Sequence, residues 1–116
     1  MRNRVLVVVL IALLSAFPVR YAAADAGKET QGIDGKIMGL FLEGEQRQQE
    51  KRYPEAIMVY RRSLKIKPNQ PDLLFRIGYC YERMGESKKA LDYYKQALAL
   101  NPALDEARKY VESHPQ

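Results

Sequence analysis

The sequence contains a single cysteine, Cys80, and a single histidine, His114. One cysteine cannot form an internal disulfide, so the stability of the folded chain must come from packing. One histidine close to the C-terminus excludes a histidine-based catalytic triad and a histidine-rich metal site, and Cys80 alone cannot hold a metal. Because Cys80 lies in a strongly helical apolar stretch, we interpret it as a buried thiol; a reactive or intermolecular thiol is the alternative.

Patterns for binding phosphate or nucleic acid are also missing. Gly35, Gly39 and Gly44 follow no predicted strand and lack the Walker lysine pattern. Lysine and arginine are scattered among acidic residues, and the pair Lys88-Lys89 is typical of a solvated helix face. We therefore predict no enzymatic activity, no cofactor, no metal and no nucleic-acid partner.

Residues 1–24 have the order of a secretory signal. Arg2 and Arg4 precede an apolar run from Val5 to Phe17, and small residues follow, so cleavage is expected after Ala24 or Ala26. The run is shorter than the roughly 20 residues that a helix needs to cross a bilayer. This pattern predicts an exported protein, most simply a periplasmic one.

An uncleaved signal-anchor facing the periplasm is the alternative, because Val19 and Tyr21 could lengthen the apolar stretch if Arg20 snorkelled. Only in that case would the membrane be a partner. Cleavage after residue 24 would remove three arginines and lower the formal net charge from +5 to +2.

The sequence repeats itself at a shift of 34 residues, which is typical of helical-repeat proteins. Six pairs of identical residues share this register: Leu40 and Leu74, Gly44 and Gly78, Ala56 and Ala90, Tyr60 and Tyr94, Leu64 and Leu98, Pro68 and Pro102.

Apolar residues in the second copy recur with a helical period. They form two stripes separated by Gly85, a residue suited to the left-handed end of a helix. Gly78 lies within the first stripe, where the missing side chain would let two helices pack closely. The stripes are Leu74, Ile77, Gly78 and Tyr81, then Leu91, Tyr94 and Leu98.

The second copy resembles the tetratricopeptide repeat at nearly every signature position, from Leu74-x-x-Ile77-Gly78-x-x-Tyr81 through Ala90-x-x-x-Tyr94 to Pro102. The resemblance implies an all-α fold, a short α-solenoid over residues 34–116. Two helix-turn-helix repeats are expected at about 37–70 and 71–104, with a capping helix at about 105–114. Residues 25–33, with Gly27 and Gly32, are expected to be a flexible lead-in.

The first copy departs from this pattern. Glu43 and Arg47 replace the second copy's Ile77 and Tyr81, and Lys51 replaces the turn glycine. Two repeats and a cap are few, because stacked repeats generally need about three units to bury a continuous core. Self-association is therefore expected, through the uncapped surface formed by Ile37, Met38 and Phe41.

The resemblance also implies a concave groove, lined by the first helix of each repeat, that binds a peptide or protein segment. In the second repeat Phe75, Tyr79 and Arg83 share one helical stripe, typical of a binding hot spot; packing of the aromatics against the capping helix is the alternative. By position the groove residues are Met38, Phe41, Glu45, Gln48, Gln49, Phe75, Tyr79, Glu82 and Arg83.

Some members of this family bind acidic C-termini of chaperones through a basic clamp. The matching positions here retain a single basic residue, so a cytosolic co-chaperone role is disfavoured. They hold Phe41, Glu45, Arg76, Glu106 and Tyr110. We predict a protein-interaction module, a periplasmic adaptor or assembly factor; a self-associating structural module and a membrane-tethered scaffold are the alternatives.

Overall fold

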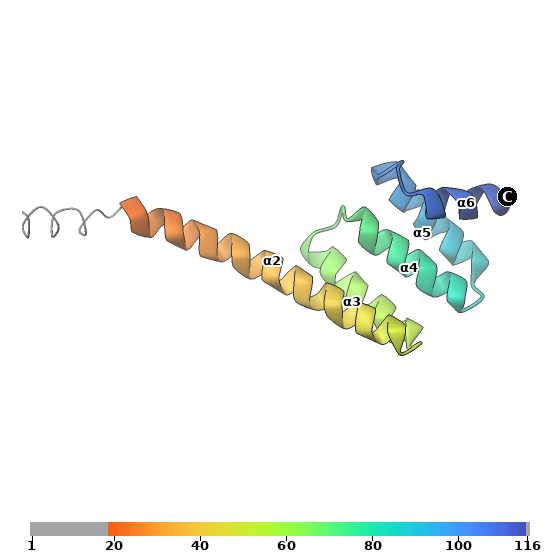
Figure 1. Cartoon of the computed structure of the whole chain (residues 1–116), viewed down its shortest axis with the longest axis horizontal. Coiled ribbons are helices and arrows are strands. Elements are labelled where there is room, and N and C mark those ends of the chain that lie inside the picture. The colour runs from red at the N-terminus through yellow and green to blue at the C-terminus, as the bar shows by residue number, and fades with distance from the viewer. Residues whose placement is uncertain (1–18, 116) are drawn as a thin grey trace, which may run out of the picture. The chain divides into compact units, whose positions relative to one another are not determined.

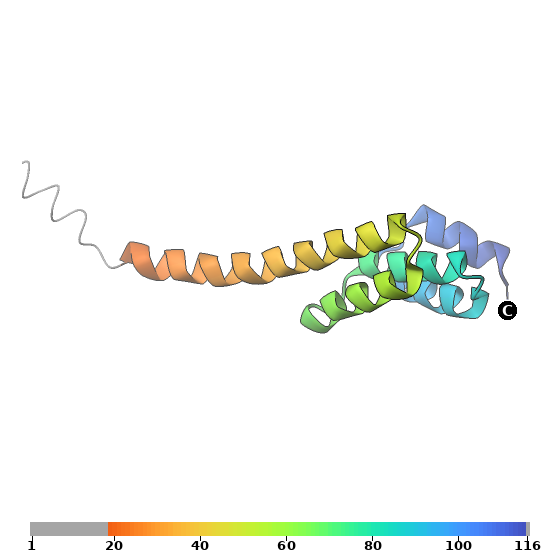
Figure 2. The ribbon, with the colours of Figure 1, turned by 90° about the horizontal axis from the view of Figure 1, so that it is seen from below.

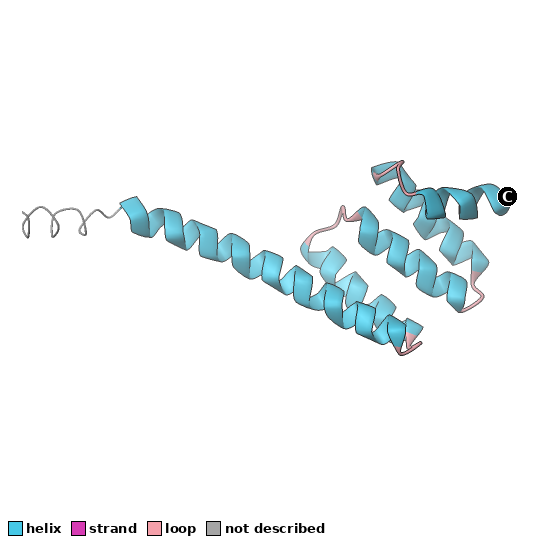
Figure 3. Ribbon diagram, viewed as in Figure 1, coloured by secondary structure: helices cyan, strands magenta, loops and turns pink. Residues whose placement is uncertain are grey.

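The computed structural model describes residues 19–115, and this part of the chain is all-helical with short connections (Figures 1 and 3). The predicted all-α class is confirmed. Most of the predicted signal segment lies outside the described residues. The helices are α2 (Val19–Gln49), α3 (Tyr53–Ile66), α4 (Pro71–Arg83), α5 (Ser87–Leu100) and α6 (Asp105–Ser113).

The chain divides into two compact units, residues 1–34 and residues 35–116. The described part of the first unit, residues 19–34, is entirely helical. Residues 25–33, which were expected to be a flexible lead-in, lie within α2 in the structure. No proline occurs between Pro18 and Pro54, and alanine, glutamate, lysine and glutamine offset the cost of the glycines, so nothing stops the helix.

No helix within residues 19–115 combines the length and the apolar character needed to cross a membrane.

In the second unit, prolines and acidic residues mark where helices begin. Pro54 lies in the first turn of α3 and Pro71 opens α4, positions where a missing N–H costs nothing. Glu55 and Asp72 lie in the same first turns, where a carboxylate interacts favourably with the exposed N–H groups of the helix.

The two helical hairpins turn at equivalent residues. Gly85, between α4 and α5, has a positive φ of 78°, as expected for the predicted turn glycine. Lys51 holds the same place between α2 and α3 and has a φ of 62°, which a residue with a Cβ adopts at a cost. The first hairpin thus keeps the turn geometry without the residue best suited to it.

A glycine and a tyrosine close each hairpin. A Cβ on Gly78 would lie 2.9 Å from ring atoms of Tyr94, and one on Gly44 would overlap the ring of Tyr60. Each tyrosine is almost fully buried, and its hydroxyl donates a hydrogen bond to the first helix of its own hairpin. The bond from Tyr60 to Gln48 Oε1 is 3.0 Å long, and the bond from Tyr94 to Glu82 Oε2 is 2.5 Å long.

The core continues from the first hairpin into the second, and Figures 1 and 2 show α3, α4 and α5 side by side. Ile57 on α3 belongs to the same buried cluster as Leu73 and Ile77 on α4. Cys80 lies in this cluster with no exposed surface, and burial raises the pKa of its thiol to about 11. The prediction of a buried thiol is confirmed, and the thiolate needed for reactivity is disfavoured.

Candidate functional site

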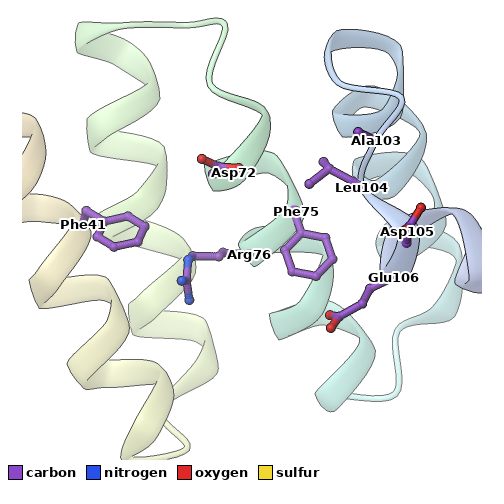
Figure 4. A pocket seen from close by; sticks show the side chains of 8 residues that line it. All are labelled: Phe41, Asp72, Phe75, Arg76, Ala103, Leu104, Asp105 and Glu106. Atoms are coloured by element: carbon purple, nitrogen blue, oxygen red, sulfur yellow. The ribbon is translucent and has the colours of Figure 1, made fainter.

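Three adjoining hollows follow the faces of α2, α4 and α6 within residues 35–116. The central hollow, of about 370 Å³, is drawn in Figure 4. It shares Phe41 and Asp72 with a second hollow of about 390 Å³, and Phe75 and Glu106 with a third of about 450 Å³. Because neighbouring hollows share residues from both walls, we treat them as one continuous groove.

The partly exposed aromatic residues of the groove come from three helices. Phe41 is supplied by α2, Phe75 and Tyr79 by α4, and Tyr110 by α6. All four are partly exposed. The ring of Phe75 also packs on buried Tyr94, at a centroid distance of 5.4 Å, and Tyr94 packs on Tyr110 at 4.8 Å. Phe75 therefore has one face in the core and another in the groove.

Arg76 is the basic residue of the central hollow, and its guanidinium group is held by two contacts. Nη2 lies 2.7 Å from Glu45 Oε1, and the guanidinium carbon lies 4.7 Å from the centroid of the Phe41 ring. Figure 4 shows Arg76 reaching from α4 toward Phe41. Both charged side chains of the pair are only 29% exposed, which reduces screening by water. The ion pair ties α4 to α2 across the groove floor.

Acidic residues at the starts of α4 and α6 border the same hollow. Asp72 lies in the first turn of α4, and Asp105 and Glu106 lie in the first turn of α6. In Figure 4 Glu106 extends from α6 to the neighbourhood of Phe75. The Asp105 carboxylate has an ion pair with Arg108 at 3.3 Å, and Asp105 is 73% exposed, so this pair contributes little stability.

Five of the nine predicted groove residues line the groove: Met38, Phe41, Phe75, Tyr79 and Glu82.

The other four predicted residues lie elsewhere. Glu45 touches the groove only through Arg76, and Gln48 accepts the hydrogen bond from Tyr60 described above. Gln49 and Arg83 are exposed and line none of the three hollows. The neighbouring Tyr53 hydroxyl raises the pKa of Arg83.

The predicted set omitted the wall supplied by the capping helix and its approach. Leu104, Asp105 and Lys109 line the groove from this side, and Asp72 lines it from α4. One signal could have found part of this wall. Glu106 lies one repeat length after Asp72 and also occupies one of the positions that match the family's basic clamp.

Within the described residues, no group of three or more histidine, cysteine, aspartate or glutamate side chains is arranged to hold a metal ion.

Comparisons with known proteins agree on one family. The tetratricopeptide repeat model matches residues 71–104, and a second model, described as TPR repeat, matches residues 44–85.

Two curated relatives are similar to this chain in sequence. Photosystem I assembly protein Ycf3 of Rippkaea orientalis is 33% identical over 70 residues, which are 58% of this chain and 40% of the relative. The protein of the same name from Cuscuta gronovii is 33% identical over 81 residues, 67% of this chain and 48% of the relative. The chain thus spans less than half the length of these relatives.

Solved structures show the same fold. The first TPR of Spaghetti (RPAP3), bound to HSP90 peptide SRMEEVD, has a TM-score of 0.63 at 24% identity, covering 68% of this chain and 63% of that one. The Sgt2 TPR domain from Aspergillus fumigatus has a TM-score of 0.61 at 26% identity, covering 66% and 50%. Because the two family models together span residues 44–104, more than half of the sequence, the chain belongs to the tetratricopeptide repeat family.

Proposed function

We propose that this chain is a protein-binding module that holds a segment of a partner protein in the groove along α2, α4 and α6. One observation carries the proposal: three adjoining hollows form a continuous groove, lined by partly exposed aromatic side chains on packed helices. Aromatic side chains on a rigid support are the usual anchors of protein interfaces, because they bury much surface at little entropic cost.

The relatives support an interaction role. Tetratricopeptide proteins are typically protein-binding scaffolds without enzymatic activity. Ycf3 is named as an assembly protein, and the Spaghetti repeat was solved with a bound peptide. We extend this role to the present chain as an adaptor or assembly factor.

We also propose that the protein acts outside the cytoplasm, in the periplasm. The proposal rests on the charged, apolar and small-residue order of residues 1–24. Mass spectrometry of envelope material should find an N-terminus at Asp25 or Gly27. A full-length chain in the envelope would favour the membrane-tethered alternative, and a full-length cytoplasmic chain would contradict export.

Site-specific photo-crosslinking tests the groove directly. A photoreactive phenylalanine analogue in place of Tyr79, which lines the groove, should form an adduct with a partner in the native cell. The matched control places the same analogue at Lys95, which is exposed on α5 outside the groove. Equal adducts from both positions, or adducts from Lys95 alone, would contradict the proposed site.

The structure also separates two residues that share a helical stripe. Tyr79→Ala should weaken binding of the crosslinked partner by about 2 kcal/mol or more, the usual loss at a hot spot. Arg83→Ala serves as the control and should bind normally, because Arg83 does not line the groove. Both variants should keep the wild-type melting temperature. An early melting transition of Tyr79→Ala would show that this ring mainly packs against the capping helix.

Self-association is a second candidate function, favoured by a difference between the repeats. Met38, Leu42 and Met58 are 56%, 56% and 66% exposed. Shifted by the repeat length, these positions become Asp72, Arg76 and Asp92, which are polar. Arg76 contacts the preceding helix, α2, so its equivalent Leu42 faces the side on which a preceding repeat would pack. A second copy of the chain would cover this apolar surface.

A further inference from the structure

Charge in the central hollow of the groove is unequal. Three acidic side chains, Asp72, Asp105 and Glu106, line it together with one basic side chain, Arg76. The charge of Arg76 is already matched, because Glu45 binds it at 2.7 Å from outside the hollow. Among residues 32–115, whose side chains the structure describes, Asp72 and Glu106 have no ion pair. The hollow therefore presents negative charge to any occupant.

Helix capping does not account for this arrangement. Acidic residues in a first turn are favourable for each helix separately, and any orientation around the helix axis would serve. Here the acids of α4 and the acids of α6 border the same hollow, on either side of Phe75 and Leu104. Two helix starts thus converge on one apolar surface.

We propose that the groove binds a cationic segment of its partner, with an apolar or aromatic side chain against Phe41, Phe75 and Leu104 and a lysine or arginine facing Asp72 or Glu106. This inference rests on the proposed function and names the chemistry of the partner. It is argued from charge complementarity, because complementary potentials steer association and repel wrong partners. The same acids disfavour an acidic C-terminal peptide, since they would face its carboxylates.

The two lysines of the groove limit where the cationic residues lie. Lys67 lines the outer hollow that also contains Met38, and Lys109 lines the outer hollow that also contains Tyr79. Both are outside the central hollow. Lys67 is offset by Asp72 in its hollow, and Lys109 is partly offset by Glu82 and Glu106 in its hollow. The partner's positive charge is therefore expected in the middle of the bound segment, where acidic side chains are in greatest excess.

Three matched peptides test the inference. Their common pattern is Leu-X-Leu-Phe-Leu-X-Leu, with both X residues lysine, glutamine or glutamate and a fluorescent label at one end. Fluorescence anisotropy with the full chain should give the tightest binding for the lysine peptide and the weakest for the glutamate peptide. Replacing lysine by glutamine, and glutamine by glutamate, should each raise Kd by about threefold or more at low salt. The differences between the peptides should shrink at about 1 M salt.

The net charge of the chain makes this order informative. The full sequence carries a formal charge of +5, so unspecific attraction would favour the glutamate peptide instead. A preference for the lysine peptide must come from local acidic groups. Equal binding of the lysine and glutamate peptides, or tighter binding of the glutamate peptide, would overturn the inference.

A pair of double variants locates the preference. Asp72→Asn with Glu106→Gln should bring the Kd values of the lysine and glutamate peptides to within about twofold of each other. The control, Asp92→Asn with Glu112→Gln, makes the same change in net charge at exposed residues outside the groove. It should leave the preference intact. An unchanged preference in the groove variant, or an equal loss in the control, would overturn the assignment.

The glutamine peptide separates this inference from the proposed function. If it binds and Tyr79→Ala removes that binding while the circular dichroism spectrum is unchanged, the groove is a binding site whatever its charge preference. The proposed function would then stand even if the lysine preference failed. Absence of binding by all three peptides would overturn both.

Discussion

At the scale of single residues, Ser63 places an unsatisfied polar group in the core. It is fully buried on α3, and its hydroxyl has no hydrogen-bond partner among the described residues. The equivalent position of the second repeat holds Ala97, which is also fully buried. Ser63→Ala should raise the free energy of unfolding by about 1 kcal/mol, because an unsatisfied buried hydroxyl is removed.

Denaturant unfolding of the full chain measures this change. The matched control is Ala97→Ser, which places a hydroxyl at the same position of the second repeat and should lower the free energy of unfolding by a similar amount. A loss of stability in Ser63→Ala would show that the hydroxyl has a partner in solution.

Lys51 carries the strain of a left-handed turn without a glycine. Its φ of 62° is unfavourable for a residue with a Cβ, whereas Gly85 adopts 78° at the equivalent turn. Lys51→Gly should raise the melting temperature, with a gain of about 0.5–1 kcal/mol after the greater unfolded-state entropy of glycine is subtracted. Gly85→Lys should lower stability by about 1 kcal/mol. Thermal melts of both variants test the pair, and a Lys51→Gly variant that melts earlier would contradict the account.

Three buried groups make stability sensitive to alkali, among them Tyr94, whose hydroxyl pKa is raised by burial and by the hydrogen bond to Glu82. Burial raises the pKa of the Cys80 thiol from 9.0 to about 11 and that of the Tyr60 hydroxyl from 10.0 to about 12. For each group, at pH values between its unfolded and its folded pKa, the unfolded chain has lost a proton that the folded chain keeps. The free energy of unfolding therefore falls as pH rises through this interval. This stability is fully present below pH 9. Cys80 contributes a decline up to about pH 11 and Tyr60 one up to about pH 12, each on the order of 3 kcal/mol, and Tyr94 adds to the decline above pH 10.

Denaturation at a series of pH values checks this decline. Cys80→Ala should reduce the slope of the curve from pH 9 to 11, and Tyr60→Phe should reduce it from pH 10 to 12, where the contribution of Tyr94 remains. Tyr93→Phe is the control, because that ring is only partly buried. Constant stability across this range would contradict the burial of all three groups.

At the scale of helices, each hairpin depends on the contact between a glycine and a tyrosine. A Cβ on Gly44 would meet the Tyr60 ring, with Cδ1 at 2.7 Å, and the fully buried ring has no space into which to move. Gly44→Ala should therefore lower the free energy of unfolding by about 1–3 kcal/mol. Circular dichroism with denaturant measures the loss.

Gly39 on the same helix is the control. An added Cβ there meets nothing within 4 Å, and alanine favours the helix, so Gly39→Ala should stabilise by about 0.5–1 kcal/mol. Opposite signs for two Gly→Ala changes on one helix would be hard to explain by helix propensity alone. Stabilisation by both would contradict the hairpin contact.

The 34-residue register predicted the hairpins well because the repeat signature encodes packing. The first four identical pairs, from Leu40 and Leu74 to Tyr60 and Tyr94, are all buried. The N-terminal extent of α2 was not predicted, since its glycines indicated a loop and local composition outweighed them. Local patterns also cannot show tertiary partners. Gln48 was predicted to line the groove, but the structure shows it accepting a hydrogen bond from buried Tyr60; Glu82 does line the groove and also accepts a hydrogen bond from buried Tyr94.

At the scale of the whole molecule, the apolar surface on the first repeat predicts the oligomeric state. If Met38, Leu42 and Met58 are covered by a second copy, light scattering should show a dimer that dissociates on dilution. Leu42→Lys should shift the equilibrium to monomer without changing the melting transition of the monomer. Met84→Lys, at an exposed residue in the turn after α4, should leave the dimer intact. A monomer at every concentration would remove the self-association candidate.

The series of close-packing glycines ends at the last helix. Gly44 and Gly78 let α3 and α5 pack closely on the helices before them, but the next position in the register, on α6, is Glu112. The longer side chain prevents a further helix from approaching α6 in the same way. If copies associate, we therefore expect them to join at their first repeats, face to face. A surface that contacts the same surface of a second copy across a two-fold axis binds one partner only. Such association would end at a dimer and would not propagate into a filament.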